Sequence, residues 1–262
     1  AASSNKPLDA LITGAALWET TPEQFETQFK GAGLQWLSAN KDQARFFGDN
    51  FNVFAGELKV LEAIAEFQNG KLARVNLSLF NRGDSGSEPA NAAQFEAQVT
   101  QLKNIISTHL GVKAVDRGKD ASSAVKAIGV TWSKDPSAYL LEYSYQKEVK
   151  SQNKEFRPEF IRLRVAPMPK QALLGSAPAA NKPVAKATLT SNITKDANGD
   201  IVIKNVPMVD QGPKGYCAVA TAERVFKYYG LNVDQHEMAA VANTSDGGGT
   251  SPTQMVGALK AL

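Results

Sequence analysis

Apolar residues recur every three or four positions in two stretches of the first region of the chain, and both stretches predict amphipathic helices. The first helix begins at a capping box, with Thr21 at the cap, a proline as the first helical residue and Gln24 three positions after the cap. Phe25 and Phe29 then lie on one face of that helix. A second helix is predicted over 91–110, and the glycine that follows it ends it.

Between and after these helices the pattern changes to short apolar and alternating runs, which are typical of β-strands. The runs on either side of Asn69-Gly70 predict a hairpin, and a further turn is predicted at Asp135-Pro136. The predicted strands cover 34–38, 44–47, 51–54, 62–67, 71–80, 128–133, 139–145 and 160–165. The pattern therefore predicts an α+β domain, with helices on one face of an antiparallel sheet.

Parts of this first region resemble one another. The similar pairs are QFETQ at 24–28 with QFEAQ at 94–98, Trp36 with Trp132, and 71–79 with 159–165. Two explanations stay open. The region is a pseudo-duplicated unit of helix and strands, or the similarity between two amphipathic segments arises by chance.

The stretch 166–190, APMPKQALLGSAPAANKPVAKATLT, is rich in proline, alanine and lysine and has no aromatic residue. Such a composition makes a poor core and predicts a linker. The sequence therefore divides into an N-terminal α/β domain over 1–165, a linker over 166–190 and a second region over 191–262.

The second region begins with acidic and amide residues around Asn198-Gly199. Their alternation is similar to a calcium loop, but the glycine comes one place early and no glutamate follows at the required distance, so a hairpin is predicted and no metal is expected. The alternating run over 201–209 is then predicted to be a strand.

Composition and charge limit the classes of function. The formal net charge is only +3, with acids and bases interspersed, which argues against nucleic acid as the main partner. No apolar run approaches the roughly 20 residues of a membrane-spanning helix. The small, polar start AASSNKPLDA is what signal peptidase leaves behind, which predicts a secreted, periplasmic or cell-envelope protein, although a recombinant start would look the same.

The single cysteine, Cys217, lies where the glycine-rich turn of QGPKGYC leads into an apolar helix. A thiol at a helix N-terminus meets the positive end of the dipole, which favours the nucleophilic thiolate. Gln211 precedes it by six positions, and its amide together with the Cys217 N–H would form an oxyanion hole. The alternative is a buried, inert cysteine. The helix is predicted to end at Gly230 and to bury one stripe: Val219, Ala222, Val225, Phe226 and Tyr229.

QGPKGYC, the preceding NVPMVDQ and the following ERVFKYYG together resemble the papain-like cysteine peptidases, in particular the bacterial branch that includes bacteriocin-leader-processing peptidases. GGGTSPTQMVGALKAL is similar to the next helix of that branch. The resemblance covers 201–262 only, and Ala218 departs from the tryptophan of papain. It implies a thiol protease that hydrolyses peptide bonds in a protein or peptide substrate without a cofactor, with Cys217 as nucleophile and Gln211 in the oxyanion hole.

The histidine base of these enzymes lies far downstream of the cysteine, whereas only 45 residues follow Cys217. His236 is expected in the first turn of a short helix, where the dipole disfavours an imidazolium, so it is not expected to be the base. His109 is expected at a helix C-terminus in a structural role. We therefore expect an accessory or pro-domain joined to a truncated peptidase domain that lacks its base and is inactive alone.

Two other functions remain as alternatives. The chain is a non-catalytic protein- or peptide-binding module with a remnant peptidase segment, or the duplicated domain binds nucleic acid like the saddle of TATA-binding proteins. The mild net charge argues against the second.

Overall fold

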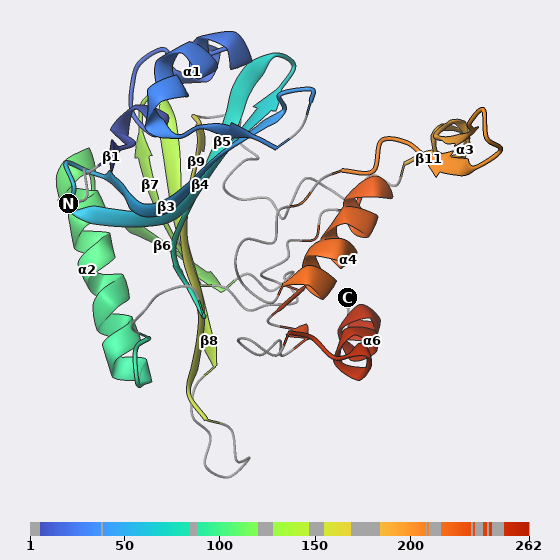
Figure 1. Cartoon of the computed structure of the whole chain (residues 1–262). Coiled ribbons are helices and arrows are strands. Elements are labelled where there is room, and N and C mark those ends of the chain that lie inside the picture. Colours follow the sequence, from blue (N-terminus) through green and yellow to red (C-terminus); the bar gives the residue numbers. More distant parts are fainter. Residues whose placement is uncertain are drawn as a thin grey trace. The chain divides into compact units, whose positions relative to one another are not determined.

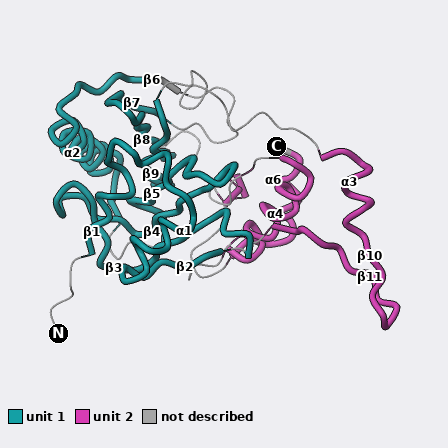
Figure 2. Tube along the Cα trace, turned by 90° about the horizontal axis from the view of Figure 1, so that it is seen from above, with its two compact units in different colours: residues 1–175 teal, residues 176–262 magenta. Residues whose placement is uncertain are grey.

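The computed structural model describes most of the chain as two compact units, residues 1–175 and 176–262 (Figure 2). The described residues are 6–37, 39–83, 88–119, 128–146, 155–168, 184–207, 209, 216–231, 233, 238–239, 241–242 and 249–261. The chain is of mixed α+β class, with one large, mostly antiparallel sheet and a few helices. Most of the predicted linker lies outside the described residues, so its extent stays a prediction.

Unit 1 is built on a nine-stranded sheet (Figure 1). The strands follow the order β1-β3-β4-β5-β9-β8-β7-β6, with β2 also paired to β3, and only the β1–β3 pair is parallel. The strands are β1 (Lys6–Pro7), β2 (Gln35–Trp36), β3 (Gln43–Val53), β4 (Leu58–Gln68), β5 (Lys71–Asn81), β6 (Val115–Lys119), β7 (Ile128–Lys134), β8 (Ser137–Gln146) and β9 (Arg157–Pro167).

One face of this sheet carries the hydrophobic core. Directly paired residues on neighbouring strands point to the same face, so the register defines rows of side chains across the sheet. One such row consists of Phe46, Ala63, Leu77, Leu163, Leu141 and Val130. The next consists of Ala44, Ala65, Val75, Val165, Tyr139 and Trp132. Every member of both rows is at most 3% exposed, and we call this side the core face.

Helix α1 (Pro22–Phe29) packs on the core face near β3 and β4. The predicted capping box is confirmed, because the Gln24 N–H donates to Thr21 Oγ1 at 3.4 Å and the Thr21 N–H donates to Gln24 Oε1 at 3.0 Å. The ring of Phe25 lies 6.1 Å from that of Phe46 and 5.1 Å from that of Phe67. Three short 3-10 helices accompany it: η1 (Asp9–Leu11), η2 (Leu17–Glu19) and η3 (Lys30–Ala32).

Helix α2 (Ala92–Leu110) runs along the core face beside the second half of the sheet (Figure 1). Its predicted bounds are confirmed: Asn91 caps the start by accepting from the Gln94 N–H at 3.0 Å, and Gly111 ends the helix at φ 67°. The Trp132 indole N–H donates to Ser107 Oγ at 2.8 Å, which ties α2 to β7.

The elements of unit 1 follow the same order twice. The first set is α1, β2, β3, β4 and β5, and the second is α2, β6, β7, β8 and β9, with β5 and β9 paired at the centre of the sheet. Phe25 and Phe95 each stand four residues after a helix cap and are at most 1% exposed. Trp36 and Trp132 lie on β2 and β7, which hold different places in the two sets, so the predicted match between these tryptophans is wrong.

The hairpin predicted at Asn69-Gly70 is confirmed: it joins β4 to β5, with φ angles of 54° and 74°. The strands predicted at 44–47 and 51–54 are instead one strand, β3. Its pairing with β4 shifts between Phe47 and Phe51, where Gly48 has a φ of 147° that favours glycine. The strand predicted over 34–38 is reduced to the two residues of β2.

Unit 2 holds short helices and one small sheet among its described residues. The elements are α3 (Lys186–Ser191), β10 (Ile193–Lys195), β11 (Ile201–Ile203), α4 (Cys217–Tyr228) and α6 (Pro252–Ala261). Strands β10 and β11 form the hairpin predicted at Asn198-Gly199. The strand predicted to reach residue 209 ends at Ile203, and Asn205 has a left-handed φ of 61° that interrupts the extended run.

No helix among the described residues is both long enough and apolar enough to cross a bilayer.

Candidate active site

The candidate nucleophile, Cys217, is the first residue of helix α4, and its side chain is exposed. Tyr216 precedes it as the cap residue and makes no side-chain capping bond. The free N–H groups of a first helical turn point towards an anion placed beside them. The thiol therefore lies at the end of the helix where a negative charge is stabilised, and it is open to a reagent or substrate.

Local interactions place the start of α4 at this cysteine. The Ala220 N–H donates to the Tyr216 carbonyl at 2.8 Å, which closes the first turn. The Thr221 hydroxyl donates to the Cys217 carbonyl at 2.7 Å, an additional bond from the following turn. Two glycines in the sequence before the helix, at 212 and 215, and alanines within it favour the same boundary, since glycine disfavours helix and alanine favours it.

The C-terminal end of α4 is also fixed by the backbone. Gly230 takes a φ of 79°, and the Leu231 N–H donates to the Phe226 carbonyl at 2.8 Å. A left-handed glycine with such a bond is a common helix stop. The predicted end of the helix in the sequence YYG is confirmed.

Three members of the predicted stripe of α4 face a small core: Val219 is buried, and Ala222 and Phe226 pack against that core partly buried. The buried positions are Tyr216, Val219, Ala220 and Glu223, each at most 6% exposed. Tyr216 and Val219 belong to this second small core, which also contains Met238, Ala239, Ala242 and Ala258. Ala220 and Glu223 are the other buried residues of the helix. Val225 and Tyr229 are 47% and 49% exposed, so their predicted burial is wrong. Tyr216, Ala220 and Glu223 are buried although they lie outside the predicted stripe.

Glu223 is a site feature that the sequence did not indicate. Its carboxylate is only 5% exposed and lies 2.6 Å from Lys227 Nζ, one turn further along α4. The i,i+4 spacing of Glu and Lys predicts a surface ion pair, and no signal in the pattern showed that the acid is buried. Glu223 stands six residues after Cys217 in the helix and anchors the buried face of α4 rather than the thiol.

The other end of α4 is tied to the residues that follow the linker. Asn192, which is 9% exposed, donates from Nδ2 to the Tyr228 hydroxyl at 3.3 Å and accepts from Asn205 Nδ2 at 2.8 Å. Arg224 Nε donates to the Pro207 carbonyl at 2.9 Å. The segment that leads towards Gln211 is therefore bonded to α4 directly at Pro207, and through Asn192 at Asn205.

The remaining predicted site residues are not brought together among the described residues. Gln211 and His236 both lie outside the described residues. His109 lies in the last turn of α2 in unit 1, as predicted, where its Nε2 is 3.2 Å from Glu57 Oε1 and its ring is 5.2 Å from that of Phe54. Of the two predicted catalytic residues, Cys217 and Gln211, only Cys217 lies among the described residues.

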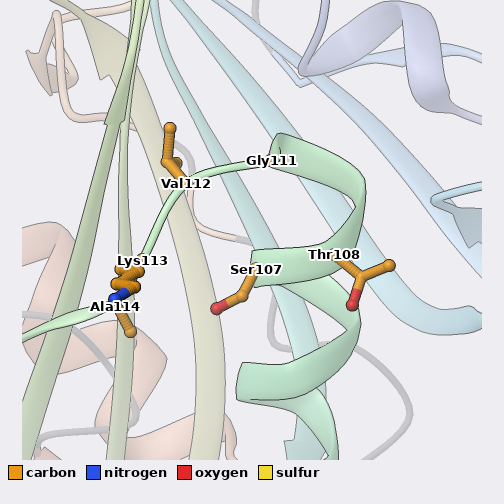
Figure 3. Close-up of a pocket in the computed structure, with 6 residues that line it drawn as sticks. All are labelled: Ser107, Thr108, Gly111, Val112, Lys113 and Ala114. Atoms are coloured by element: carbon orange, nitrogen blue, oxygen red, sulfur yellow. The ribbon is translucent and has the colours of Figure 1, made fainter.

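A hollow of about 350 Å³ lies at the C-terminal end of α2 (Figure 3). It is lined by Ser107, Thr108, Gly111, Val112, Lys113 and Ala114. Lys113 is the one charged residue of this lining, and Ser107 accepts the Trp132 indole N–H. The lining holds no nucleophile with a base. Among the described residues no group of three or more His, Cys, Asp or Glu side chains could hold a metal ion.

None of the known protein families, curated proteins or solved structures compared with the chain matches it.

Proposed function

We propose that residues 191–262 form the first part of a papain-like cysteine peptidase domain that hydrolyses peptide bonds. The observation that carries this proposal is the position of Cys217, an exposed thiol on the first residue of an amphipathic helix. The sequence before it supplies a glutamine and a glycine-rich turn at the spacing found in those enzymes. Cysteine peptidases place the nucleophile at a helix N-terminus for the same electrostatic reason.

In the proposed mechanism the Cys217 thiolate attacks the carbonyl carbon of a peptide substrate. Negative charge develops on the carbonyl oxygen, and the Gln211 side-chain amide and the Cys217 N–H donate to it. A histidine imidazolium then protonates the leaving amine, and water hydrolyses the thioester that remains on Cys217. The proposal assigns this histidine to no described residue.

Unit 1 is proposed to be an accessory or pro-domain that arose by internal duplication. The repeated order of helix and four strands supports the duplication.

The proposal can be tested by trapping the thiol with a peptidyl chloromethyl ketone and locating the adduct by mass spectrometry. We expect one adduct per chain, on Cys217, with a rate that saturates as the reagent concentration rises, because a substrate site binds the peptidyl part first. Cys217→Ser is the control that keeps the size of the side chain, and it should form no adduct.

The role of Gln211 separates catalysis from simple thiol reactivity. In a complete enzyme that supplies the histidine, Gln211→Ala should lower the kcat of peptide cleavage by about 10²–10³, the usual cost of one oxyanion donor, and leave alkylation of Cys217 by iodoacetamide unchanged. Cys217→Ala should abolish cleavage without unfolding α4, since alanine favours helix. A Cys217 adduct that forms at a rate linear in reagent and equal to that of the unfolded chain contradicts the proposal.

A further inference from the structure

The hairpin of β10 and β11 in unit 2 forms a small sheet of its own (Figure 2). Among the described residues no third strand pairs with either of its two strands. An unpaired strand edge presents backbone N–H and C=O groups that a further strand can bond. A two-stranded hairpin is also only marginally stable by itself, so it is stabilised when strands are added to it.

The hydrogen bonds within the hairpin show which backbone groups of β11 point outwards. The Asp200 carbonyl accepts, at 2.9 Å, from the N–H of the residue that follows β10. The Lys204 N–H donates, at 2.9 Å, to the carbonyl of the residue that precedes β10. Because the bonding direction alternates along an antiparallel strand, Ile201 and Ile203 turn their N–H and C=O groups away from β10.

The side chains along this edge are apolar and exposed. Ile201, Val202 and Ile203 are 74%, 40% and 54% exposed. Three β-branched residues in succession favour pairing with another strand. Strand edges that avoid pairing usually carry charged residues or proline, and these three positions carry neither. The edge of β10 is less suited, because it carries Lys195 and because helix α3 ends one residue before the strand begins.

The sequence of this edge, DIVIK at 200–204, is complementary to an antiparallel copy of itself. In a pair centred on Val202, Ile201 lies opposite the partner's Ile203, and Asp200 lies opposite the partner's Lys204. Opposite charges and two β-branched residues are both favourable cross-strand pairs. A shift of one residue in either direction would set Asp200 and Lys204 opposite uncharged residues.

The direction of the backbone groups supports the same register. Residues opposite each other in an antiparallel ladder exchange hydrogen bonds only where both turn their N–H and C=O groups towards the other strand. In the pair centred on Val202, these positions are Ile201 and the partner's Ile203, together with the equivalent pair on the other side of the centre. They are the residues of β11 whose backbone groups point outwards.

We propose that two copies of the chain associate through the exposed edges of β11, antiparallel and about a two-fold axis at Val202, so that their hairpins form one four-stranded sheet. Such an interface is self-complementary, as a two-fold axis requires. It is smaller than the roughly 1,000 Å² of a stable interface, so we expect a weak dimer with a Kd on the order of 100 μM. The proposal does not depend on the chemistry of Cys217.

The dimer is tested by sedimentation equilibrium of the 262-residue chain at about 10 μM and about 500 μM, concentrations on either side of the expected Kd. A reducing buffer prevents a disulfide between the exposed Cys217 thiols of two chains. We expect the average mass to rise with concentration from the 28.1 kDa of one chain towards twice that value.

Charge variants test the register of the pair. Asp200→Lys and Lys204→Asp each set like charges opposite each other and should raise the Kd by about tenfold. An equimolar mixture of these two variants places opposite charges together again, so the dimer should return. Its return also shows that the hairpin is folded in both variants. Lys195→Asp makes the same change of charge on β10 and should change the Kd less than about twofold.

Four results would overturn the proposal. The first is the mass of one chain at both concentrations. The second is an equal rise of the Kd in Lys195→Asp and Lys204→Asp, which would indicate another surface or a general charge effect. The third is a mixture of the two charge variants that associates no better than either variant alone. The fourth is a mass that grows beyond two chains, which would indicate open-ended association instead of a closed pair.

Discussion

Cys217 differs from most free cysteines in the environment of its side chain. Free cysteine is among the residue types most often buried, and an inert cysteine packs as a small apolar side chain. Here Tyr216, Val219 and Ala220 are buried. Cys217, which lies between them in the sequence, is exposed. Since its side chain contributes little packing, a chemical role gives a reason for a thiol at this position, and it supports the proposal of a nucleophile.

Two glycines of unit 1 give a prediction at the same scale. Gly70 has a φ of 74° and Gly31 does not lie in the positive-φ region, and a methyl group at either position would meet no atom within 4 Å. Gly70→Ala should therefore lower the free energy of unfolding by about 1–2 kcal/mol through backbone strain alone. Gly31→Ala should raise it by up to about 1 kcal/mol, because alanine has less entropy to lose on folding.

Urea unfolding followed by tryptophan fluorescence measures both glycine variants, since all three tryptophans lie in unit 1. If the free energy of unfolding changed in the same direction in both variants, steric or solvent effects would outweigh the effect of the φ angle at residue 70.

Among the elements, those with local signals could be predicted from the sequence. The capping box at Thr21 and the glycine after residue 110 are signals that act within a few residues. The first correctly predicted the start of α1, and the second correctly predicted the end of α2. The Asn69-Gly70 hairpin is likewise set by its own two φ angles. Positions that depend on distant partners could not be predicted: the irregularity within β3 is defined by its pairing with β4, and the burial of Tyr216 depends on a core that also contains Met238, Ala239, Ala242 and Ala258.

Helix α4 gives a prediction that separates two members of the predicted stripe, Val219, which is buried, and Val225, which is exposed. Val219→Ala should lower the stability of the helix by about 2 kcal/mol, because the side chain is fully buried and its removal leaves a cavity. Val225→Ala should change it by less than about 0.5 kcal/mol, because that side chain is 47% exposed.

Hydrogen exchange of α4 amides, read by mass spectrometry of peptides from 217–228, measures the two valine variants without interference from unit 1. Faster exchange in Val225→Ala than in Val219→Ala would mean that Val225, and not Val219, faces the small core.

At the scale of the whole molecule, the chain combines an apolar-cored α+β unit with a smaller unit that carries the candidate site. The sequence predicted the class of unit 1, since alternation and helical periodicity are averaged over many residues. It could not predict the central pairing of β5 with β9, because these strands are separated by a helix and three further strands along the chain. The site itself is described only at Cys217, so its oxyanion hole stays a prediction.

The division of the chain can be tested by limited proteolysis. The first cut should fall between about 166 and 190, because this stretch is rich in proline and alanine and the two units meet within it in sequence. The larger product, identified by its intact mass, should keep the tryptophan fluorescence of the whole chain. A first cut between 91 and 165 would contradict a boundary at the linker.

The most direct test of the account is the rate at which Cys217, the single thiol of the chain, reacts with iodoacetamide. The rate is measured at about pH 6.5, a pH at which few ordinary thiols are ionised. It is measured for the folded chain and for the same chain unfolded in urea. If Cys217 is the nucleophile, we expect the folded chain to react roughly tenfold faster, because the side chain is exposed at the first residue of α4, a position at which catalytic cysteines react readily. A folded chain that reacts no faster than the unfolded one would contradict the assignment of Cys217 as a nucleophile.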